Sequence, residues 1–372
     1  MIPFLTLAYL LLLPFRWPAL PWGMQACDVV LVGLLVALCW VDDDTRLRGH
    51  PLDVLVVVWI VGSVLAIGDP RSLVALAKDA SGLLVYFVFA LVVATEHRRW
   101  VIGALAGSAV LTAWLALGGV MAGAGQTSTL PWLGTVPRTA WPFHSPEMLA
   151  CFLALALPFL ILFGRVWPCP LATLGAVALA FTATFAHALA GLYVGLAWLL
   201  PRGRKWALAS ALVVVLVVNA LLVVSPSRTH YQMPNGLMSY AVLKQLAVEA
   251  WWTSPVVGIG LGTFHDVTRQ AVQEGRMPPG WEAVDPHSTW FGRLAETGLL
   301  GFATLAALWV GVLRLIAKPG PDPGLHRAVA AGLLALLVAS LNIDVMHFRF
   351  LWVGLALLRS TSGIAAPQTT PR

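Results

Sequence analysis

The chain has 372 residues, of which 59% are hydrophobic and only 11% are charged. Soluble domains typically carry about 25% charged residues, so this composition excludes an ordinary soluble protein and indicates a polytopic membrane protein. In a membrane protein the net charge, here +6, reflects mainly the basic residues of the loops on the cytoplasmic side. It does not indicate a charged partner, and we expect no nucleic-acid ligand.

Apolar runs predict about twelve transmembrane helices. In chain order they fall near residues 2–15, 24–41, 52–68, 72–95, 100–121, 146–164, 170–184, 187–200, 205–224, 288–316, 327–345 and 346–360. The first run lacks the basic n-region and cleavage site of a signal peptide, so it is interpreted as a helix that is kept. We therefore expect an all-α polytopic membrane protein, with residues 1–372 forming a single integral membrane domain.

Basic residues in the connections predict the orientation of these helices. With the N-terminus inside, the cytoplasmic ends hold Arg46, Arg48, Arg98, Arg99, Arg165, Arg202, Arg204, Lys205, Arg314, Lys318, Arg327, Arg359 and Arg372. The short outer connections hold only Arg16, Arg71, Arg138 and Arg349. The positive-inside rule therefore places the long loop 225–287, between the ninth and tenth helices, on the extracytoplasmic face.

Ionisable residues gather at the predicted outer helix ends. They are Asp28, Lys78, Asp79, Arg138, His144, Glu147, His187, His287, Arg293, Asp344, His347 and Arg349. This pattern predicts a polar basin that opens outward above an apolar body, rich in the cations that suit a phosphate or pyrophosphate on a lipid tail. A secondary transporter would instead hold its polar site at the bilayer midplane.

The stretch VDPHSTWFGRLAETGLLG, residues 284–301, places a histidine directly before a long apolar helix. Inside that helix Arg293 and Glu296 are three residues apart, and we expect them to pair and neutralise each other rather than to act in catalysis. His287 stands before the helix and after a proline. It either caps the helix or acts chemically, and its neighbourhood favours a chemical role.

The long loop carries two further patterns. SPVVGIGLGTF, residues 254–264, resembles a nucleotide-binding fingerprint, but no βαβ unit surrounds it, and a glycine-rich turn that permits close backbone packing fits better. LMSYAVLKQLAVEAWW, residues 237–252, predicts an amphipathic helix whose apolar face contains Leu243, Leu246, Ala247 and Ala250. This helix is expected either to lie on the membrane surface or to cap the basin.

Two patterns that can bind metals are interpreted as structural. Asp42 and Asp44 form a D-x-D arrangement, but it falls in a predicted cytoplasmic loop beside two arginines, and a solvated loop is expected. The four cysteines lie in or beside apolar runs without metal-binding or disulfide spacing. We expect no metal and no cofactor.

Taken together, SPVVGIGLGTF and PHSTWFGRLAETGLLG resemble the signature of the O-antigen ligase and O-antigen polymerase superfamily. Members show a Pro-x-x-Gly-x-Gly turn, then His-Asn or His-Ser opening a helix that reads Leu-Ala-Glu-x-Gly-x-x-Gly. PFHSPEMLACFLALALPF, residues 142–159, is similar to an earlier Asn-Pro-Asn-x-Leu-Ala segment of the family, and LNIDVMHFRFLWVGLALL is similar to its closing helix pair. The resemblance covers roughly residues 135–360.

The resemblance implies a metal-independent glycosyltransferase of the bacterial inner membrane, with its active site facing the periplasm. Such enzymes take a glycan from undecaprenyl pyrophosphate and pass it to an acceptor hydroxyl on another glycan, on lipid A-core or on a protein, in lipopolysaccharide or exopolysaccharide biosynthesis. Carried over by motif, the catalytic residue is His287, with an imidazole suited to act as a general base near neutral pH.

The chain departs from the family where arginines are usual. Around the seventh and eighth helices it reads AHALAG, with His187, and Tyr240 stands where an arginine often opens the loop helix. The candidates for the pyrophosphate clamp are therefore Arg138, Arg228 and Arg349, and the further site candidates are His187, His144, Lys244, Arg269 and His347. Two alternatives remain open: a lipid-linked glycan flippase or transporter, and a non-catalytic membrane subunit of a glycan-assembly complex.

Overall fold

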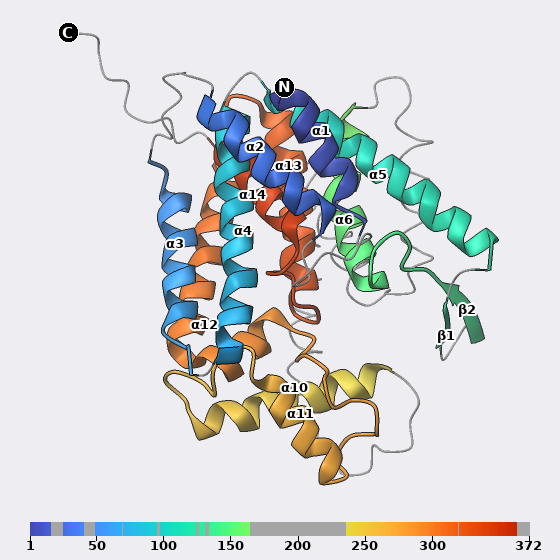
Figure 1. The fold of residues 1–372 in the computed structure, drawn as a ribbon, viewed down its shortest axis with the longest axis vertical. Coiled ribbons are helices and arrows are strands. Elements are labelled where there is room, and N and C mark those ends of the chain that lie inside the picture. Colours follow the sequence, from blue (N-terminus) through green and yellow to red (C-terminus); the bar gives the residue numbers. More distant parts are fainter. Residues whose placement is uncertain are drawn as a thin grey trace.

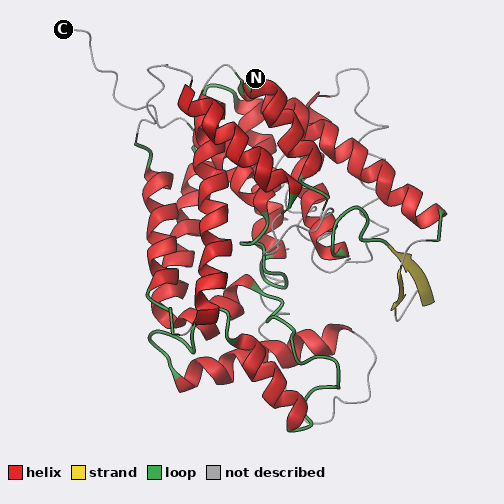
Figure 2. Ribbon diagram, viewed as in Figure 1, coloured by secondary structure: helices red, strands yellow, loops and turns green. Residues whose placement is uncertain are grey.

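A computed structural model describes residues 1–15, 25–40, 49–68, 70–94, 97–123, 126–130, 134–163, 236–318 and 320–362. The described part is mainly helical, as the composition predicts (Figures 1 and 2). The predicted helices 170–184, 187–200 and 205–224 lie outside the described residues, and so do the predicted site residues His187 and Arg228.

Nine described helices coincide with predicted apolar runs. They are α1 (Ile2–Leu12), α2 (Ala26–Trp40), α3 (Pro51–Val64), α4 (Pro70–Ala94), α5 (Arg98–Met121), α6 (Pro146–Phe163), α12 (Thr289–Ile316), α13 (Pro323–Ala339) and α14 (Arg349–Thr361). Among the described residues, α4, α5 and α12 are long and apolar enough to cross a membrane, and α1, α2, α3, α6 and α13 are shorter apolar helices. The count of twelve spans stays a prediction.

The boundary between the last two helices differs from the prediction. The sequence predicts helices over 327–345 and 346–360, whereas α13 ends at Ala339 and α14 begins at Arg349. Polar side chains form the connection: the Asp344 carboxylate accepts the Met346 backbone N–H at 3.1 Å, and Thr289 Oγ1 accepts the Val345 N–H at 2.9 Å. Such side-chain bonds to the backbone compete with helix continuation, so Asp344 and His347 lie in a loop.

The connection after α5 contains a two-stranded antiparallel hairpin that the all-α prediction missed. Strand β1 (Gln126–Leu130) pairs with β2 (Gly134–Arg138), with Gln126 opposite Arg138. Its sequence, QTSTL and then GTVPR, is rich in the β-branched residues that favour strands. Apolar periodicity alone does not detect so short a polar hairpin.

Close packing joins helices that are distant in sequence. A Cβ on Gly82 of α4 would lie 2.2 Å from Trp352 Nε1 of α14, and a Cβ on Gly332 of α13 would lie 2.6 Å from the Leu155 carbonyl of α6. Small residues that admit a neighbour in this way are typical of helix contacts in membranes. The rings of Trp59 and Trp352, 5.1 Å apart, join α3 to α14 in the same buried cluster.

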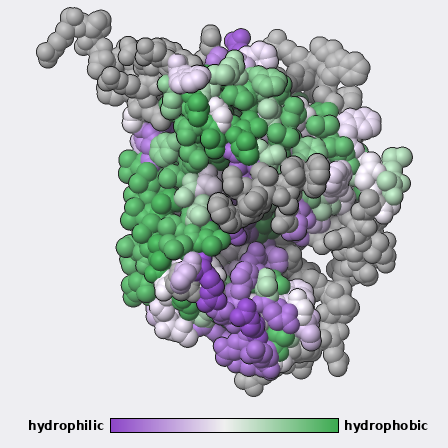
Figure 3. All heavy atoms as spheres, viewed as in Figure 1, coloured by the Kyte–Doolittle hydropathy of each residue, from purple (hydrophilic) through white to green (hydrophobic). Residues whose placement is uncertain are grey.

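Two helices of the long loop, α10 (Gly236–Thr253) and α11 (Phe264–Gln273), lie across the ends of α3, α4 and α12 (Figure 1). The predicted apolar face of α10 is buried in a small cluster of its own with Phe264, Ala271, Met277 and Ala295. This face therefore packs against protein, and we call the α10–α11 unit, residues 236–287, the cap. Figure 3 shows an apolar surface over the helical body and a hydrophilic one over the cap.

Candidate functional site

The two segments that carry the family resemblance are bonded to each other at a break in α12. Gly298, inside this helix, has φ +62° and ψ −161°, a conformation that L side chains rarely adopt. The Ile259 and Gly260 backbone N–H groups donate to the Ala295 and Glu296 carbonyls at 2.9 and 3.1 Å. Beyond the break, the Leu299 and Leu300 N–H groups donate to loop carbonyls at Pro255 and Val256. The glycine-rich turn thus completes the backbone bonding of the broken helix.

Glycine is required where this turn meets the helix. Gly258 has φ +77°, and a Cβ there would lie 2.3 Å from the Glu296 carbonyl carbon. A Cβ on Gly298 would lie 2.4 Å from the Val256 carbonyl oxygen. The prediction of a turn for close backbone packing is confirmed, and the packing fixes the part of α12 that carries Arg293 and Glu296.

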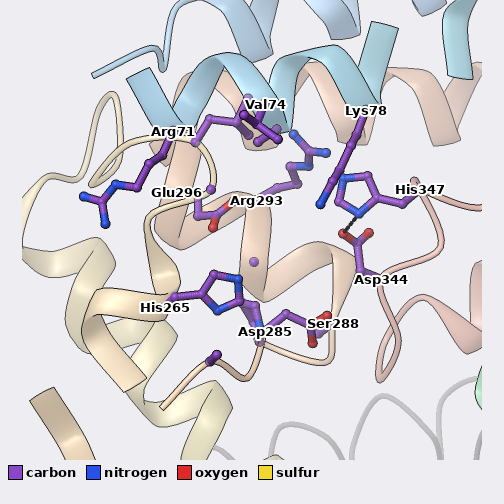
Figure 4. Close-up of a pocket in the computed structure, with 16 residues that line it drawn as sticks. Arg71, Val74, Lys78, His265, Asp285, Ser288, Arg293, Glu296, Asp344 and His347 are labelled. Atoms are coloured by element: carbon purple, nitrogen blue, oxygen red, sulfur yellow. Dashed lines mark ion pairs between the residues drawn. The ribbon is translucent and has the colours of Figure 1, made fainter. Parts of the chain in front are cut away.

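A cavity of about 420 Å³ opens between the start of α4, the first turns of α12 and the cap. Each surrounding segment contributes ionisable side chains: Arg71 and Lys78 from α4, His265 from α11, Arg293 and Glu296 from α12, Asp285 from the loop before it, and Asp344 and His347 from the α13–α14 connection (Figure 4). Four residues of the predicted polar basin, Lys78, Arg293, Asp344 and His347, therefore line a cavity at one end of the apolar helices, and its charge is mixed rather than mainly cationic.

The expected Arg293–Glu296 pairing is wrong. Arg293 instead forms two 2.7 Å hydrogen bonds to the two carboxylate oxygens of Asp79 on α4, a third at 3.2 Å to Ser63 of α3, and stacks over Trp59. Asp79 is fully buried, and Arg293 is 4% exposed. A bidentate partner from a neighbouring helix satisfies the buried guanidinium better than a carboxylate one turn away on its own helix.

Glu296 does not pair with Arg293 and instead binds the cap. Its Oε1 accepts the backbone N–H of Phe264 at 3.2 Å, at the first residue of α11. A carboxylate beside a helix N-terminus satisfies donors that have no partner within the helix. Glu296 thereby fixes the start of α11, and with it the neighbouring His265, over the cavity.

His347 is a cation held between two carboxylates. Its Nδ1 lies 3.1 Å from Asp344, and its Nε2 lies 3.4 Å from Asp79. Burial lowers the pKa of His347, but the two carboxylates outweigh burial and raise the pKa to about 10. The side chain is still 38% exposed, so it presents positive charge to the cavity at neutral pH.

Lys78 and His265 differ from these paired groups. Both line the cavity, and within the described residues neither side chain has a hydrogen-bond or ion-pair partner. Lys78 reaches toward the cavity beside His347, while His265 approaches from the opposite side (Figure 4). Arg71, seven residues before Lys78, binds Asp266 of α11 at 2.8 Å. The cavity thus offers an ammonium and an imidazole that no described carboxylate engages.

His287, the predicted catalytic residue, lies at the edge of this cavity. Its neighbours Pro286 and Ser288 line the cavity, but His287 does not. Its Nδ1 lies 3.3 Å from Asp285 Oδ1, the side chain is 34% exposed, and its φ is +46°, unusual for a residue other than glycine. The capping function belongs to Ser288, whose Oγ accepts the Phe291 N–H at 3.4 Å.

The other predicted site residues are spread over the molecule. Arg349 forms two 2.7 Å bonds to Asp28 at the start of α2, away from the cavity lining. Lys244 is fully buried, donates to Asn342 and lies over the Phe291 ring. Arg269 is exposed and pairs with Asp266 at 3.2 Å. Among the candidates whose side chains the structure describes, His347 alone lines the cavity.

Two predicted candidates lie near α6 and β2. His144 is exposed just before α6, and Arg138 ends β2, with its side chain outside the described part.

Arg71, Lys78 and His265 are not among the site residues predicted from the sequence, although Lys78 belongs to the predicted polar basin. Arg71 and Lys78 are seven residues apart, a spacing that places two side chains on one face of a helix, so a signal was present for that pair. His265 follows the glycine-rich turn directly, but only the contact between this turn and α12 brings it to the cavity. Within the described ranges, no three His, Cys, Asp or Glu side chains converge as metal ligands would.

No protein-family model matches the chain, and no curated protein matches it. The site therefore has to be interpreted from its own residues.

Proposed function

We propose that the protein is a membrane glycosyltransferase that moves a glycan from undecaprenyl pyrophosphate to an acceptor hydroxyl. In this proposal the chain has about twelve transmembrane helices in the bacterial inner membrane, and the cap and cavity face the periplasm. The acceptor is a glycan, lipid A-core or a protein, as the resemblance to O-antigen ligases and polymerases implies.

One observation carries the proposal. The two segments that resemble the family, 254–264 and 286–301, are bonded through their backbones at the α12 break and together border a mixed-charge cavity, which contains Lys78 and His347, at the end of apolar helices. A lipid-linked pyrophosphate needs this combination: charge for the headgroup beside apolar surface for the tail. A polar site at one end of the helices also differs from the midplane site of a secondary transporter.

The residues around the cavity divide the proposed chemistry between them. The acceptor oxygen forms a bond to the anomeric carbon of the glycan, the bond from that carbon to the pyrophosphate oxygen breaks, and undecaprenyl pyrophosphate leaves with the bonding electrons. Lys78 and the protonated His347 stabilise the negative charge on the leaving oxygens. His287, with Asp285 beside Nδ1, takes the proton of the acceptor hydroxyl.

This assignment changes the proposed pyrophosphate site. The sequence favours an arginine clamp of Arg138, Arg228 and Arg349, but Arg349 is bound to Asp28. The cavity instead contains Lys78, which no described carboxylate engages. We therefore assign the pyrophosphate first to Lys78 and His347, with Arg138 and Arg228 as candidates that the described side chains do not include.

Purified protein in liposomes tests the proposal. The protein is given lipid-linked glycan and candidate acceptors, and released undecaprenyl pyrophosphate is measured. We expect release with the wild type and a loss of at least tenfold with Lys78→Gln, while Lys318→Gln, which removes an exposed lysine beyond α12, releases it at the wild-type rate. A flippase would move the lipid between leaflets without release, and a non-catalytic subunit would do neither; either result overturns the proposal.

A further inference from the structure

The cap has one end without ionisable residues and one end rich in them. Residues 250–264 contain no ionisable side chain and include the pair Trp251–Trp252, whereas residues 265–285 contain seven ionisable side chains. The first segment runs from the end of α10 through the glycine-rich turn, and the second comprises α11 and the loop after it. The two ends of the cap are therefore built for different surroundings.

Exposed apolar side chains gather at the uncharged end. Trp252 is 66% exposed, Val256 57%, Val257 45%, Leu299 49% and Leu300 44%. They form one patch, because the Leu299 and Leu300 N–H groups bond to the Pro255 and Val256 carbonyls at 2.9 and 3.1 Å. We call these five exposed residues the apolar edge.

The apolar edge continues the surface that the helices present to lipid. The Leu261 N–H donates to the Ala66 carbonyl at 2.9 Å, which joins the glycine-rich turn to the end of α3. There Val64 and Leu65 are 43% and 58% exposed, and α3 exposes Val54, Val57, Val58 and Val61 along its length. An exposed valine stripe on an apolar helix is the face that a membrane-spanning helix turns to acyl chains.

The tryptophans fit the boundary between acyl chains and headgroups. The ring centroids of Trp251 and Trp252 lie 4.6 Å apart, and Trp251 Nε1 donates to the Pro255 carbonyl at 3.0 Å, so that its polar group is satisfied within the protein. Tryptophan is enriched at membrane–water interfaces, where its amphipathic ring lies at headgroup level.

We propose that the apolar edge inserts into the phospholipid leaflet on the cap's side of the membrane and anchors the cap there. The polar end with α11 then stays in water, and the cavity between them lies at the depth of the lipid phosphates. Arg71 and Lys78, on α4 at the cavity, reach that depth from within the membrane-facing body. The anchor does not depend on any transfer reaction, so it can fail or hold independently of the proposed function.

Nitroxide labels in the full chain, reconstituted in phosphatidylethanolamine–phosphatidylglycerol vesicles, test the anchor. Cys39 is exposed and Cys169 lies outside the described residues, so both are replaced by serine, while the buried Cys27 and Cys151 are kept. Labels are placed at Val257→Cys and Leu300→Cys on the apolar edge and at Gln273→Cys on the exposed side of α11. Collision rates with oxygen, which partitions into lipid, and with a water-soluble nickel chelate are then compared.

We expect the two edge labels to favour oxygen over nickel by at least tenfold relative to the Gln273 label. Equal nickel accessibility at all three sites would show that the edge lies in water and would overturn the proposal. Spin–spin broadening at Val257 and Leu300 that disappears on dilution with unlabelled protein would show that a second copy covers the edge, and would also overturn it.

A measurement on the unaltered protein guards against effects of the substitutions. A phospholipid with a photoactivated carbene on its acyl chain is added to the same vesicles, and labelled peptides are mapped by mass spectrometry. The anchor predicts label on residues 252–257 and 299–300 and none on 270–276. Label confined to the helical body, with none on 252–257, contradicts it.

Discussion

The two ends of α14 and the cavity beside it treat their charges differently. At the ends of α14, Arg349 binds Asp28 and Arg359 binds Asp53, each through two oxygens of a carboxylate on another helix. In the cavity, Arg293 forms the same kind of bidentate ion pair with Asp79. Lys78 and His265 have no side-chain partner within the described residues. Of these described charges, Arg349, Arg359 and Arg293 each join two helices, whereas Lys78 and His265 face the cavity.

Charges that join two helices and charges that face the cavity should differ in their effect on the stability of the protein. Removing a charge that joins two helices should lower the stability of the protein, because its partner is left in a poorly solvated place. Removing a charge that faces the cavity should leave stability unchanged and affect ligand binding alone.

Asp79→Asn is expected to have the largest effect. It leaves Arg293, which is 4% exposed, without a counterion, and removes a carboxylate from His347. Breaking a buried ion pair from one side typically costs about 3–5 kcal/mol. Thermal unfolding in detergent, followed by size-exclusion chromatography, measures the loss. The control is Asp285→Asn, which removes an exposed carboxylate at the same cavity; equal unfolding temperatures for the two variants would place Asp79 among the cavity charges.

The burial of Lys244 should make the stability of the protein depend on pH. Burial lowers the pKa of this lysine from 10.5 to about 8, so the folded protein carries a penalty for the protonated amine. The penalty is fully present below pH 8 and disappears above pH 10.5, and the unfolding free energy should therefore rise between these values. Lys244→Met should remove this rise relative to wild type. A profile that is identical in the two proteins would show that Lys244 does not control it.

Arg349→Lys is expected to have a smaller effect on stability. A lysine keeps the charge but loses one of the two hydrogen bonds to Asp28, at a cost of about 1–2 kcal/mol. Because Asp28 engages the guanidinium, we expect glycan transfer per folded molecule to stay at the wild-type level. An unfolding temperature equal to that of the wild type, together with reduced transfer, would show that Arg349 binds the pyrophosphate, as the sequence favours.

The sequence predicts nine of the described helices, because long apolar runs favour helices that are buried in protein or lipid. It also predicts the glycine-rich turn and the cluster of ionisable residues at one set of helix ends. It does not predict their partners. Arg293 has a carboxylate three residues away in Glu296, and only the packing of α4 against α14 and of α12 against α3 brings Asp79 to Arg293. The sequence likewise does not distinguish Arg349 from Lys78, because both are basic residues near predicted outer helix ends. In the structure Arg349 pairs with Asp28, whereas Lys78 lines the cavity.

The smallest effect on stability is expected for the two imidazoles at the cavity, and they decide its chemistry. The family resemblance implies that His287 is the base, whereas the cavity is lined by His265. Asparagine is the suitable replacement at both, because it tolerates the positive φ of His287, and neither variant should change stability by more than about 0.5 kcal/mol.

If His287 accepts the proton of the acceptor, His287→Asn should lower kcat by about 10²- to 10⁴-fold and leave KM for the lipid-linked donor unchanged. In that case His265, which lines the cavity, is expected only to help Lys78 and His347 bind the pyrophosphate, so its replacement should raise that KM and change kcat little. Steady-state release of undecaprenyl pyrophosphate at several donor concentrations separates the two parameters. The reverse outcome, a loss of kcat with His265→Asn and wild-type turnover with His287→Asn, would move the base from the edge of the cavity to its lining.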